Sequence, residues 1–510
     1  MQEFNPAPKL LKSLLPAAVQ GDFSEQLLIN DIQIDSRNVT PGSLFVALKG
    51  QRDNGERYIS SAVENGAVAV LVEDALLSSV FNLEIPIVGI NDLKHRLGKV
   101  AADFFDRPSS SLSLVGITGT NGKSSIASYC AQLTQQLGQT SGIVGTLGYG
   151  LVNSRYESTG MTTPDVVSCQ RILAELKSAG AKNVAMEVSS HGIDQNRVDE
   201  ILFDVAVISN ITRDHMDYHA SFDDYAATKL SFLESTACKT AVINANDEHC
   251  AKAIAGIKKA KECVSYAVKN GSAQVKADVR GVVNKFSDSG MNATIESPWG
   301  KAHVYVPLVG AFNLDNLLAA ISASCLQGND FDSVIGNVEN LRALEGRMEK
   351  VRIQNGSSSP SVFVDYAHTP DALENALCAL KEHTDGNLLL VFGCGGDRDT
   401  GKREEMGRIA EKYADEVIVT SDNPRSEDPN KIIADIEKGL IENTKCHKIS
   451  DRAEAIAMAV NGASSSDVVL IAGKGHEDYQ IVGDKKIYFS DYMVAKNMLE
   501  NRRGAEQVQA

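Results

Sequence analysis

The chain has 510 residues, of which 43% are hydrophobic and 23% are charged, so it is long enough for about three compact domains and apolar enough to bury their cores. Its formal net charge of −16 argues against a nucleic-acid-binding surface, which relies on clustered lysine and arginine. The longest apolar runs have only the length of a strand, and the N-terminus lacks the apolar segment of a secretory signal. We therefore expect a cytoplasmic protein that binds neither nucleic acid nor membrane.

The nine cysteines are scattered along the chain and form no CxxC pair, a pattern typical of a reducing compartment. We expect each cysteine to be a small buried apolar residue, because free cysteine is among the most buried residue types. The cysteines therefore indicate neither a metal site nor a nucleophilic thiol.

Short apolar strands and one helix are predicted in residues 1–90. The strands are Ser43–Leu48, Ala67–Glu73 and Ile85–Ile90, and the helix lies near Tyr58–Glu64. This pattern predicts a small α/β unit. A helical stretch from Asn91 to Phe105 follows, and we place a domain boundary near residue 90.

Strands rich in β-branched residues alternate with helical segments in the rest of the chain. In residues 91–346 the predicted strands are Leu112–Ile117, Asn183–Val188, Asp204–Ser209 and Thr240–Asn244. In residues 347–510 they are Ser361–Tyr366, Asn387–Gly393, Glu416–Ser421 and Asp467–Gly473, and the predicted helices include Thr400–Tyr413 and Pro429–Ile441. This alternation predicts two mostly parallel, doubly wound sheets, which bind ligands outside the carboxyl ends of their strands.

The glycine-rich segment after the first of these strands is typical of a phosphate-binding loop. It reads Thr118-Gly119-Thr120-Asn121-Gly122-Lys123-Ser124-Ser125 and enters a helix with an apolar stripe of Ile126, Tyr129, Cys130, Leu133 and Leu137. Its backbone N–H groups can surround phosphate oxygens, Lys123 can reach the β- and γ-phosphates, and Ser124 can bind Mg²⁺. Ile117 stands where the general GxxxxGK[ST] pattern has its first glycine, and a glycine-rich turn with a solvated lysine is the alternative.

The form TGTNGKS resembles the phosphate loop of the muramyl (Mur) ligases and the folylpolyglutamate synthases. Further segments extend the resemblance to the Mur ligases over nearly the whole chain: Met186–His191, Asn210–His215, Lys229, Asn313–Asn316, Gly346-Arg347 and Asp365–His368. The family implies a three-domain α/β architecture and an ATP-dependent, amide-forming ligase of peptidoglycan precursor synthesis. Its domains would be a UDP-sugar-binding domain (1–90), a central P-loop ATPase-like parallel-sheet domain (91–346) and a C-terminal Rossmann-like amino-acid-binding domain (347–510).

The resemblance implies an ATP and Mg²⁺ site. Its ATP-binding residues are Gly119, Thr120, Asn121, Gly122, Lys123, Ser124, Ser125, Asn313, Asn316, Arg347 and Asp365. Its catalytic residues are Lys123, Lys229, Glu187, His215 and Arg347, and its metal ligands are Ser124, Glu187, His215 and Lys229. The carboxylate of Glu187 and the imidazole of His215 are suitable ligands for Mg²⁺. Alternatively, Glu187 is a solvated loop acid and His215 a hydrogen-bonded histidine.

Five of these residues carry further expectations. Lys229 has the context of an ordinary surface helix lysine, but the resemblance implies an Nζ carbamate (N6-carboxylysine), which requires a depressed lysine pKa. Asn313 and Asn316 could read an adenine edge, and helix N-terminal capping is the alternative for one of them. Arg347 is the candidate for the γ-phosphate, and Asp365 would accept hydrogen bonds from ribose or position that arginine.

The resemblance assigns the UDP-N-acetylmuramoyl-L-alanyl-D-glutamate substrate to residues of the first two domains, most of them polar. These residues are Ile34, Ser36, Gln51, Arg52, Asp53, Thr162, Thr163, Ser189, Gln195 and Arg197. Ser36, Arg37 and Arg52 could supply donors to the diphosphate. Either arginine could instead be a surface ion-pair residue.

Three polar segments follow strands in residues 347–510: Gly396-Asp397-Arg398, Asp422-Asn423-Pro424-Arg425 and Gly473-Lys474-Gly475-His476-Glu477. Together they offer guanidinium and carboxylate groups, as an amino-acid ligand requires. The Asp-Asn-Pro-Arg segment resembles family members that add meso-diaminopimelate. The implied binding residues are Arg398, Asp422, Asn423, Pro424, Arg425, Gly473 and Glu477. Alternatively, Asn423-Pro424 is a turn and Arg425 a surface charge.

Two rival functions are a folylpolyglutamate-type ligase and a P-loop switch protein that makes no product. The N-terminal unit before the P-loop argues against the first, and the three substrate-facing segments argue against the second. We expect a monomer that acts on small-molecule substrates.

Overall fold

The structure is a computed structural model. It describes residues 4–16, 19, 24–49, 54–74, 84–212, 214, 218–235, 237–269, 276–287, 289–353, 359–440 and 445–509. Residue contacts divide the chain into two compact units. The first comprises Met1–Ala267, Val275–Asp278 and Ala319–Val334, and the second Val268–Gln274, Val279–Leu318 and Ile335–Ala510. The domain boundaries near residues 90 and 346 remain predictions.

The first unit begins with a small α/β layer. Its parallel sheet has the order β3 (Asp31–Gln33), β4 (Ser43–Val46), β5 (Ala67–Glu73) and β6 (Ile87–Ile90). Ala69 and Leu71 of β5 face a core shared with α3 (Leu93–Phe104), and Val70 and Val72 face the core that contains α2 (Ile59–Glu64). This alternation is the period of a strand buried on both faces. A short pair, β1 (Lys9–Leu10) and β2 (Leu28–Ile29), was not predicted.

The second sheet of this unit centres on β7 (Ser113–Thr118). On one side lie β10 (Asn183–Glu187), β8 (Ser141–Gly145) and the antiparallel edge strand β9 (Gly148–Leu151). On the other side lie β11 (Phe203–Ile208), β12 (Cys238–Asn244) and β13 (Glu262–Val268), all parallel to β7. The chain therefore reverses its direction across the sheet at β7. Such a switch point leaves a crevice outside the carboxyl end of the strand, where ligands bind.

Helices connect the strands of this sheet as the alternating pattern predicted. They are α4 (Lys123–Gln136), α5 (Val166–Ser178), α6 (Ser190–Asp194), α7 (Phe222–Glu234) and α8 (Glu248–Ala260). α4 is more deeply buried than its predicted single stripe, since every residue from Ser125 to Ala131 is buried. A helix that enters the core along much of its circumference is held in place by packing, and this fixes the loop before it.

The second unit contains a region that the sequence reading missed. The strands β14 (Val279–Ser287), β15 (Gly290–Ser297) and β16 (Gly300–Val306) pair antiparallel. Most of their outward-facing residues are exposed or half-buried, so they lack the continuous apolar runs by which the parallel strands were recognised. The helices α9 (Ala311–Leu326) and α10 (Phe331–Ile335) follow in the chain, and their residues within Ala319–Val334 belong to the first unit.

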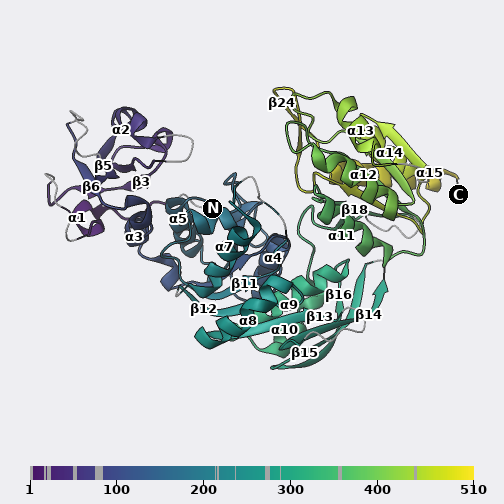
Figure 1. Ribbon diagram of the computed structural model, residues 1–510, viewed down its shortest axis with the longest axis horizontal. Helices are drawn as coiled ribbons and strands as arrows, with labels where there is room; N and C mark the ends of the chain where they lie inside the picture. The colour runs from purple at the N-terminus through teal and green to yellow at the C-terminus, as the bar shows by residue number, and fades with distance from the viewer. Residues whose placement is uncertain are drawn as a thin grey trace. The chain divides into compact units, whose positions relative to one another are not determined.

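The rest of the second unit is the predicted doubly wound domain. Its sheet has the order β17 (Glu349–Lys350), β18 (Ser361–Asp365), β22 (Val468–Ala472), β19 (Leu388–Phe392), β20 (Glu416–Thr420) and β21 (Lys445–Ile449), and only β17 is antiparallel. In β19, Leu388, Leu390 and Phe392 enter one core, whereas Leu389 and Val391 enter the other. The first core contains α11 (Pro370–Lys381), α12 (Gly401–Tyr413) and α13 (Pro429–Glu437), and the second contains α14 (Arg452–Gly462) and α15 (Asp491–Gln509) (Figure 1).

The predicted helix Pro429–Ile441 is too long, because α13 ends at Glu437 and residue 441 lies outside the described residues. Gly439 follows the end of the helix, where a Cβ atom would lie 2.0 Å from the carbonyl oxygen of Glu404 in α12. The close approach of the two helices therefore requires glycine at this position.

All nine cysteines are free, and most of them are buried, as expected from their scattered pattern. None of the helices within the described ranges has the length and apolar character needed to cross a membrane.

Asp315 in α9 is a buried carboxyl group that lowers stability when it ionises. Its Oδ1 atom has no hydrogen-bond partner among the described residues. Burial raises its pKa from 3.8 to about 7, opposed by a hydrogen bond from the backbone of Val268. Because the unfolded chain releases this proton near pH 4, the cost grows from about pH 4 to about pH 7 and is constant above that.

We expect Asp315→Asn to raise Tm at pH 8, with a gain that shrinks steadily toward pH 4. Circular dichroism during heating at several pH values measures this difference. The exposed Asp332→Asn in α10 is the control and should not change Tm. A gain independent of pH would show that the charge of Asp315 is not its cause.

Candidate active site

The glycine-rich loop of the first unit connects β7 to α4 at the switch point of the sheet. Gly119 has φ of 142° and Gly122 has φ of 86°, which favour glycine. A Cβ atom on Gly119 would lie 1.9 Å from Oγ of Ser209, so only glycine lets the loop pass the end of β11 this closely.

Residues that follow β11 form hydrogen bonds to this loop. The N–H of Asn121 donates to Oδ1 of Asn210 at 2.8 Å, and Nδ2 of Asn210 donates back to the carbonyl of Asn121 at 3.1 Å. The hydroxyl of Thr120 accepts from the N–H of Thr212 at 2.9 Å and lies 2.9 Å from the hydroxyl of Tyr225 in α7. The sequence indicated Asn210 and Thr212 only as part of a family signature. Their role as braces of the loop emerges from the structure.

Two lysines meet at one backbone oxygen of the loop. Nζ of Lys123 donates to the carbonyls of Gly119 and Thr120, each at 2.9 Å. Nζ of Lys229, from α7, donates to the same Gly119 oxygen at 2.9 Å. The charge of Lys123, beside a loop that can enclose an anion with backbone N–H groups, favours binding of a polyanion such as a nucleotide phosphate.

Lys229 is not the surface lysine that its local sequence suggested. Its residue is 1% exposed, and its Nζ lies 4.6 Å from the centre of the Tyr225 ring, one helical turn away. Burial, and then the charge of Lys123, lower the pKa of Lys229 well below its usual range. This is the direction that the carbamate expectation requires.

Glu187 ends β10, where it pairs with Ile117 beside the start of the loop. It is 2% exposed and is therefore not a solvated loop acid. Its Oε1 accepts from the N–H of Thr146 at 2.9 Å, and its Oε2 accepts from the Thr146 hydroxyl at 3.2 Å. A Cβ atom on Gly145 would lie 2.1 Å from Oε1, so glycine makes room for the carboxylate.

The chemistry of Glu187 fits a divalent cation. Within the described parts of the chain, no lysine, arginine or histidine forms an ion pair with this buried carboxylate. A hard, buried anion suits Mg²⁺, which prefers oxygen ligands. His215 lies outside the described residues, and the remaining ones contain no group of three or more His, Cys, Asp and Glu side chains that could hold a metal.

The residues predicted for the dipeptide end of the substrate form one network beside Glu187. The Thr163 hydroxyl donates to the carbonyl of Glu187 at 3.0 Å and accepts from the N–H of Ser189 at 2.9 Å. Arg197 donates to the carbonyl of Thr163 at 2.7 Å and to Oε1 of Gln195 at 2.7 Å. The hydroxyls of Thr162 and Thr146 lie 3.1 Å apart, which joins Thr162 to the same network.

Sequence reasoning missed a residue that orients this network. The hydroxyl of Tyr218 accepts from Nε2 of Gln195 at 2.9 Å and donates to Asp194 at 2.5 Å. The Gln195 amide is therefore held with its oxygen toward Arg197. Tyr218 lies three residues after the end of the family signature Asn210–His215, and this nearness was the only signal in the sequence.

The described residues predicted to bind UDP lie in the N-terminal layer and have separate surroundings. Ser36 is buried at the start of a 3₁₀ turn, and its carbonyl accepts from Nδ2 of Asn65 at 2.9 Å. Ile34 packs against the core. Arg37 forms an exposed ion pair with Asp35, which supports the surface ion-pair reading for this arginine. Gln51, Arg52 and Asp53 lie outside the described residues.

In the second unit, Asp365 at the end of β18 holds the backbone around Arg347. Its two carboxylate oxygens accept from the N–H groups of Met348 at 2.6 Å and Ala367 at 2.8 Å. Burial raises the pKa of Asp365, and the charge of Arg347 opposes this shift. The guanidinium of Arg347 lies over the ring of Tyr366, 4.6 Å from its centre.

His476 lies beside the same tyrosine, with ring centres 5.3 Å apart. Burial, and then the charge of Arg347, lower the pKa of His476 to about 4, so it is neutral at physiological pH. Its buried Nδ1 atom has no hydrogen-bond partner among the residues that the structure describes.

Asn313 and Asn316 are both buried in α9. Nδ2 of Asn313 donates to the carbonyl of Val309 at 2.7 Å, and Nδ2 of Asn316 lies 3.4 Å from Oδ1 of Asn313. These bonds differ from an N-cap, in which a side-chain oxygen accepts from a backbone N–H. They order the chain before α9, and the adenine contact remains a prediction.

The three strand-end segments of the C-terminal sheet converge, as their positions predicted. Asn423 and Lys474 both donate to Oε2 of Glu477, at 2.8 and 3.0 Å. Nη1 of Arg425 donates to the carbonyl of Gly396 at 2.8 Å, so Arg425 is not a detached surface charge. A Cβ atom on Gly473 would lie 2.5 Å from Oδ2 of Asp422.

Other residues of these segments have different surroundings. The carbonyl of Pro424 closely approaches Gly396, where a Cβ atom would lie 2.0 Å from that oxygen. Arg398 is exposed. The segments therefore present guanidinium, amide and carboxylate groups at one edge of the sheet, the set that an amino acid with extra charges requires.

Three family models match consecutive parts of the chain. They are described as Mur ligase family, catalytic domain (residues 28–105), Mur ligase middle domain (residues 117–324) and Mur ligase, glutamate ligase domain (residues 346–475). These ranges contain the P-loop, Glu187, Lys229, Arg347 and the strand-end segments as far as Gly475.

Similar proteins span almost the whole chain. A UDP-N-acetylmuramoyl-L-alanyl-D-glutamate–2,6-diaminopimelate ligase of Coxiella burnetii is 41% identical and aligns with 96% of this chain and 99% of its own length. The ligase of the same name from Pseudomonas aeruginosa is 43% identical, with 96% and 98% covered. A solved structure of a ligase with this name is 32% identical, with a TM-score of 0.72 over 98% of this chain and 100% of that chain.

We expect Lys123→Ala to abolish ATP-dependent turnover, because the side chain supplies charge to phosphate. Phosphate release measures the activity, and circular dichroism checks that the chain stays folded. Lys177→Ala, which removes an exposed lysine near the end of α5, is the matched control and should leave turnover unchanged. Near-normal turnover of Lys123→Ala would refute the assignment of the loop.

Proposed function

The chain belongs to the Mur ligase family, and from this premise we propose that it adds meso-2,6-diaminopimelate to UDP-N-acetylmuramoyl-L-alanyl-D-glutamate with hydrolysis of ATP to ADP. Relatives named for this reaction are 41% and 43% identical along nearly their whole length. The observation that carries the choice of amino acid is the position of Arg425, whose Nη1 donates to Gly396 among the three converging segments.

The proposed reaction has two steps. The D-glutamyl γ-carboxylate attacks the γ-phosphate of ATP, which forms an acyl phosphate and releases ADP. The amine of diaminopimelate then attacks the acyl carbon, the C–O bond to phosphate breaks, and the amine loses a proton. Lys123 would stabilise charge on the transferring phosphoryl group, and Arg347 is the proposed γ-phosphate ligand.

The network around Thr163 supports a role in holding the dipeptide. Ser189, Gln195 and Arg197 combine hydroxyl, amide and guanidinium groups beside Glu187, and these groups suit a carboxylate-bearing peptide. Such positioning lowers the entropic barrier to attack on phosphate.

Ser124, Glu187, His215 and a carbamylated Lys229 would hold Mg²⁺. When bound, this ion neutralises charge on the nucleotide phosphates. The buried carboxylate of Glu187 supports the assignment, and so does the lowered pKa of Lys229. The neutral amine of Lys229 can add to CO₂, which forms an N–C bond and releases a proton, and the product carries a carboxylate in place of a cation.

Phosphate release and product formation, measured with the UDP-muramoyl dipeptide and either meso-diaminopimelate or L-lysine, test the proposed function. We expect efficient turnover only with diaminopimelate. Equal use of L-lysine would overturn the amino-acid assignment, and absence of amino-acid-dependent phosphate release would overturn the ligase function.

We expect Lys229→Ala to be nearly inactive and to recover part of its activity with a small carboxylate such as acetate or formate, which can take the place of the carbamate. The same titration with Lys123→Ala is the control. It should give no recovery, because that position requires a cation. Full activity of Lys229→Ala without carboxylate would refute the carbamate.

We expect Arg425→Ala to raise KM for diaminopimelate and to leave KM for ATP nearly unchanged. A guanidinium can bind the distal carboxylate of diaminopimelate, which lysine lacks, and loss of such a desolvated pair costs about 2–5 kcal/mol, or on the order of thirtyfold or more. Steady-state kinetics with each substrate varied in turn measures both constants.

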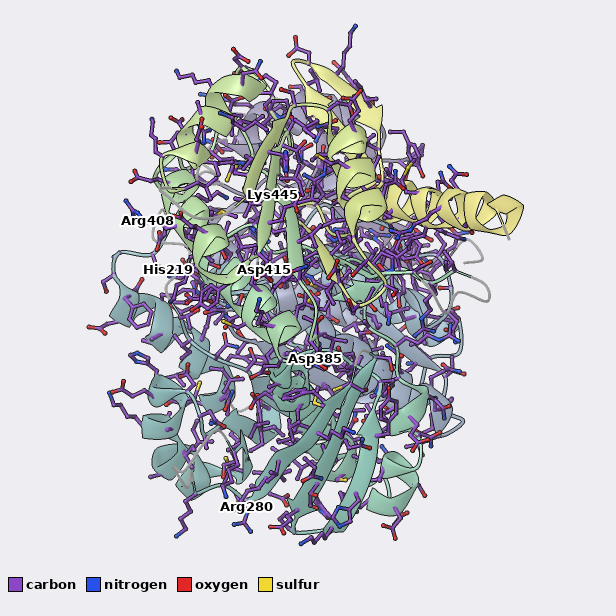
Figure 2. All side chains as sticks on the ribbon, turned by 90° about the vertical axis from the view of Figure 1, so that its right-hand side faces the viewer. His219, Arg280, Asp385, Arg408, Asp415 and Lys445 are labelled. Atoms are coloured by element: carbon purple, nitrogen blue, oxygen red, sulfur yellow. The ribbon has the colours of Figure 1, made fainter. Side chains whose placement is uncertain are left out.

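Arg408→Ala, in α12 of the same unit (Figure 2), is the matched control, because the side chain of Arg408 is exposed and pairs with Glu404. It should change neither constant. We expect no gain of lysine activity in Arg425→Ala, since removal of a repulsion does not build a lysine pocket. Unchanged diaminopimelate kinetics in Arg425→Ala would disprove the role of this residue.

A further inference from the structure

A fully buried ion pair lies beneath the converging segments of the C-terminal sheet. Arg452 is the first residue of α14, and Asp491 is the first residue of α15. Both side chains are 0% exposed. Nε and Nη2 of Arg452 donate to the two carboxylate oxygens of Asp491, each at 2.7 Å. The pair therefore has bidentate geometry, which fixes the plane of the guanidinium.

The same guanidinium also bonds to two strand ends. Nη1 of Arg452 donates to the carbonyl of Ser421 at 3.2 Å, and Nη2 donates to the carbonyl of Ala472 at 3.0 Å. Ser421 follows the last residue of β20, and Ala472 is the last residue of β22. These strands are not neighbours, because β19 lies between them. Arg452 thus connects two strand ends that share no backbone ladder.

Each of these carbonyls immediately precedes a segment assigned to the amino acid. Ser421 precedes Asp422-Asn423-Pro424-Arg425, and Ala472 precedes Gly473 and the residues up to Glu477. The spacing between the two carbonyls therefore sets where both segments begin. Beyond this point the segments contact each other through Asn423 and Glu477.

The charge of Arg452 also acts on these segments. Burial lowers the pKa of Arg452, but the carboxylate of Asp491 raises it, with smaller contributions in the same direction from Asp422 and Glu477, and together these acids leave the net pKa raised. The guanidinium accordingly stays charged and lies behind the segments that carry both acids.

Stability alone is a weak explanation for this arrangement. A buried ion pair is often no more stabilising than apolar residues of similar volume, although removal of one partner leaves a costly unpaired charge. The hydrogen bonds to Ser421 and Ala472 are different, because no apolar replacement can make them. This difference separates a structural role from a positioning role.

We propose that Arg452, held by Asp491, is a positioning residue for the incoming amino acid: it bridges the ends of β20 and β22 and thereby sets the distance between the Asp422–Arg425 and Gly473–Glu477 segments. The proposal rests on the proposed function, since it assigns these segments to diaminopimelate. Arg452 does not touch the substrate.

Three variants of the full chain test this role: Arg452→Met, the double variant Arg452→Met with Asp491→Leu, and Arg452→Lys. Steady-state kinetics gives kcat and the KM values for diaminopimelate and ATP, and thermal unfolding gives Tm. We expect Arg452→Met to lower Tm, because Asp491 is left buried without its partner. The double variant should recover Tm.

In both of these variants we expect KM for diaminopimelate to rise on the order of tenfold or more, because misplacement of binding groups by about an ångström has effects of this size or larger. KM for ATP should stay within about twofold. Arg452→Lys should give an intermediate rise, since an ammonium has no planar fork to reach both carbonyls and Asp491. If the methionine variants do not fold, Arg452→Lys alone tests the proposal. Its KM for diaminopimelate should then rise more than its KM for ATP.

Asp415→Asn is the matched control at the opposite edge of the same sheet, where Asp415 pairs with Lys381 and accepts from the N–H of Leu388 at the start of β19 (Figure 2). It should change Tm without changing either KM. Wild-type KM for diaminopimelate in the double variant, together with recovered Tm, would overturn the proposal. Failure of the wild-type enzyme to use diaminopimelate would overturn the proposed function instead.

Discussion

The carboxyl ends of parallel strands all open at one edge of their sheet, and every assigned site depends on this constraint. In the first unit, β7, β10 and β11 end beside one another and deliver the P-loop, Glu187 and Asn210. In the second unit, β22, β19 and β20 deliver the three segments assigned to the amino acid. Parallel strands require long crossover connections, so residues distant in sequence become neighbours at this edge.

Positive charge at these edges is local in a chain with a net charge of −16. Lys123 and Lys229 share the Gly119 oxygen, and this proximity, after burial, lowers the pKa of Lys229. Lys123 and the backbone N–H groups of the loop can attract phosphate without a basic surface elsewhere, whereas the lowered pKa of Lys229 favours its neutral amine. The loop groups act through short distances in a region shielded from water.

Buried arginines support the second unit's segments from behind. Arg452 bonds to Asp491 and two strand ends, and the buried Arg403 bonds to Glu427 and Asp435. Glu427 in turn accepts from the N–H of Asp397 at 2.6 Å, so the Gly396–Arg398 segment has its own brace. Guanidinium groups suit this purpose because their fixed fork bonds to several acceptors at once.

Periodicity and composition were sufficient to predict the alternating strands and helices, because strands buried on both faces are continuous apolar runs that read directly from the sequence. The positions of the P-loop and of Arg425 were predictable for the same reason. A segment that directly follows a strand of a parallel sheet must lie at the edge where the carboxyl ends of the strands meet. The antiparallel β14–β16 and the end of α13 were not, because half-exposed strands and helix crossings leave weak local patterns. Only the tertiary structure decided that Lys229 is buried against Tyr225, that Asn313 holds Val309, and that Arg452 joins two strand ends. These depend on burial and on hydrogen bonds between residues remote in sequence or on turns that local propensity does not specify.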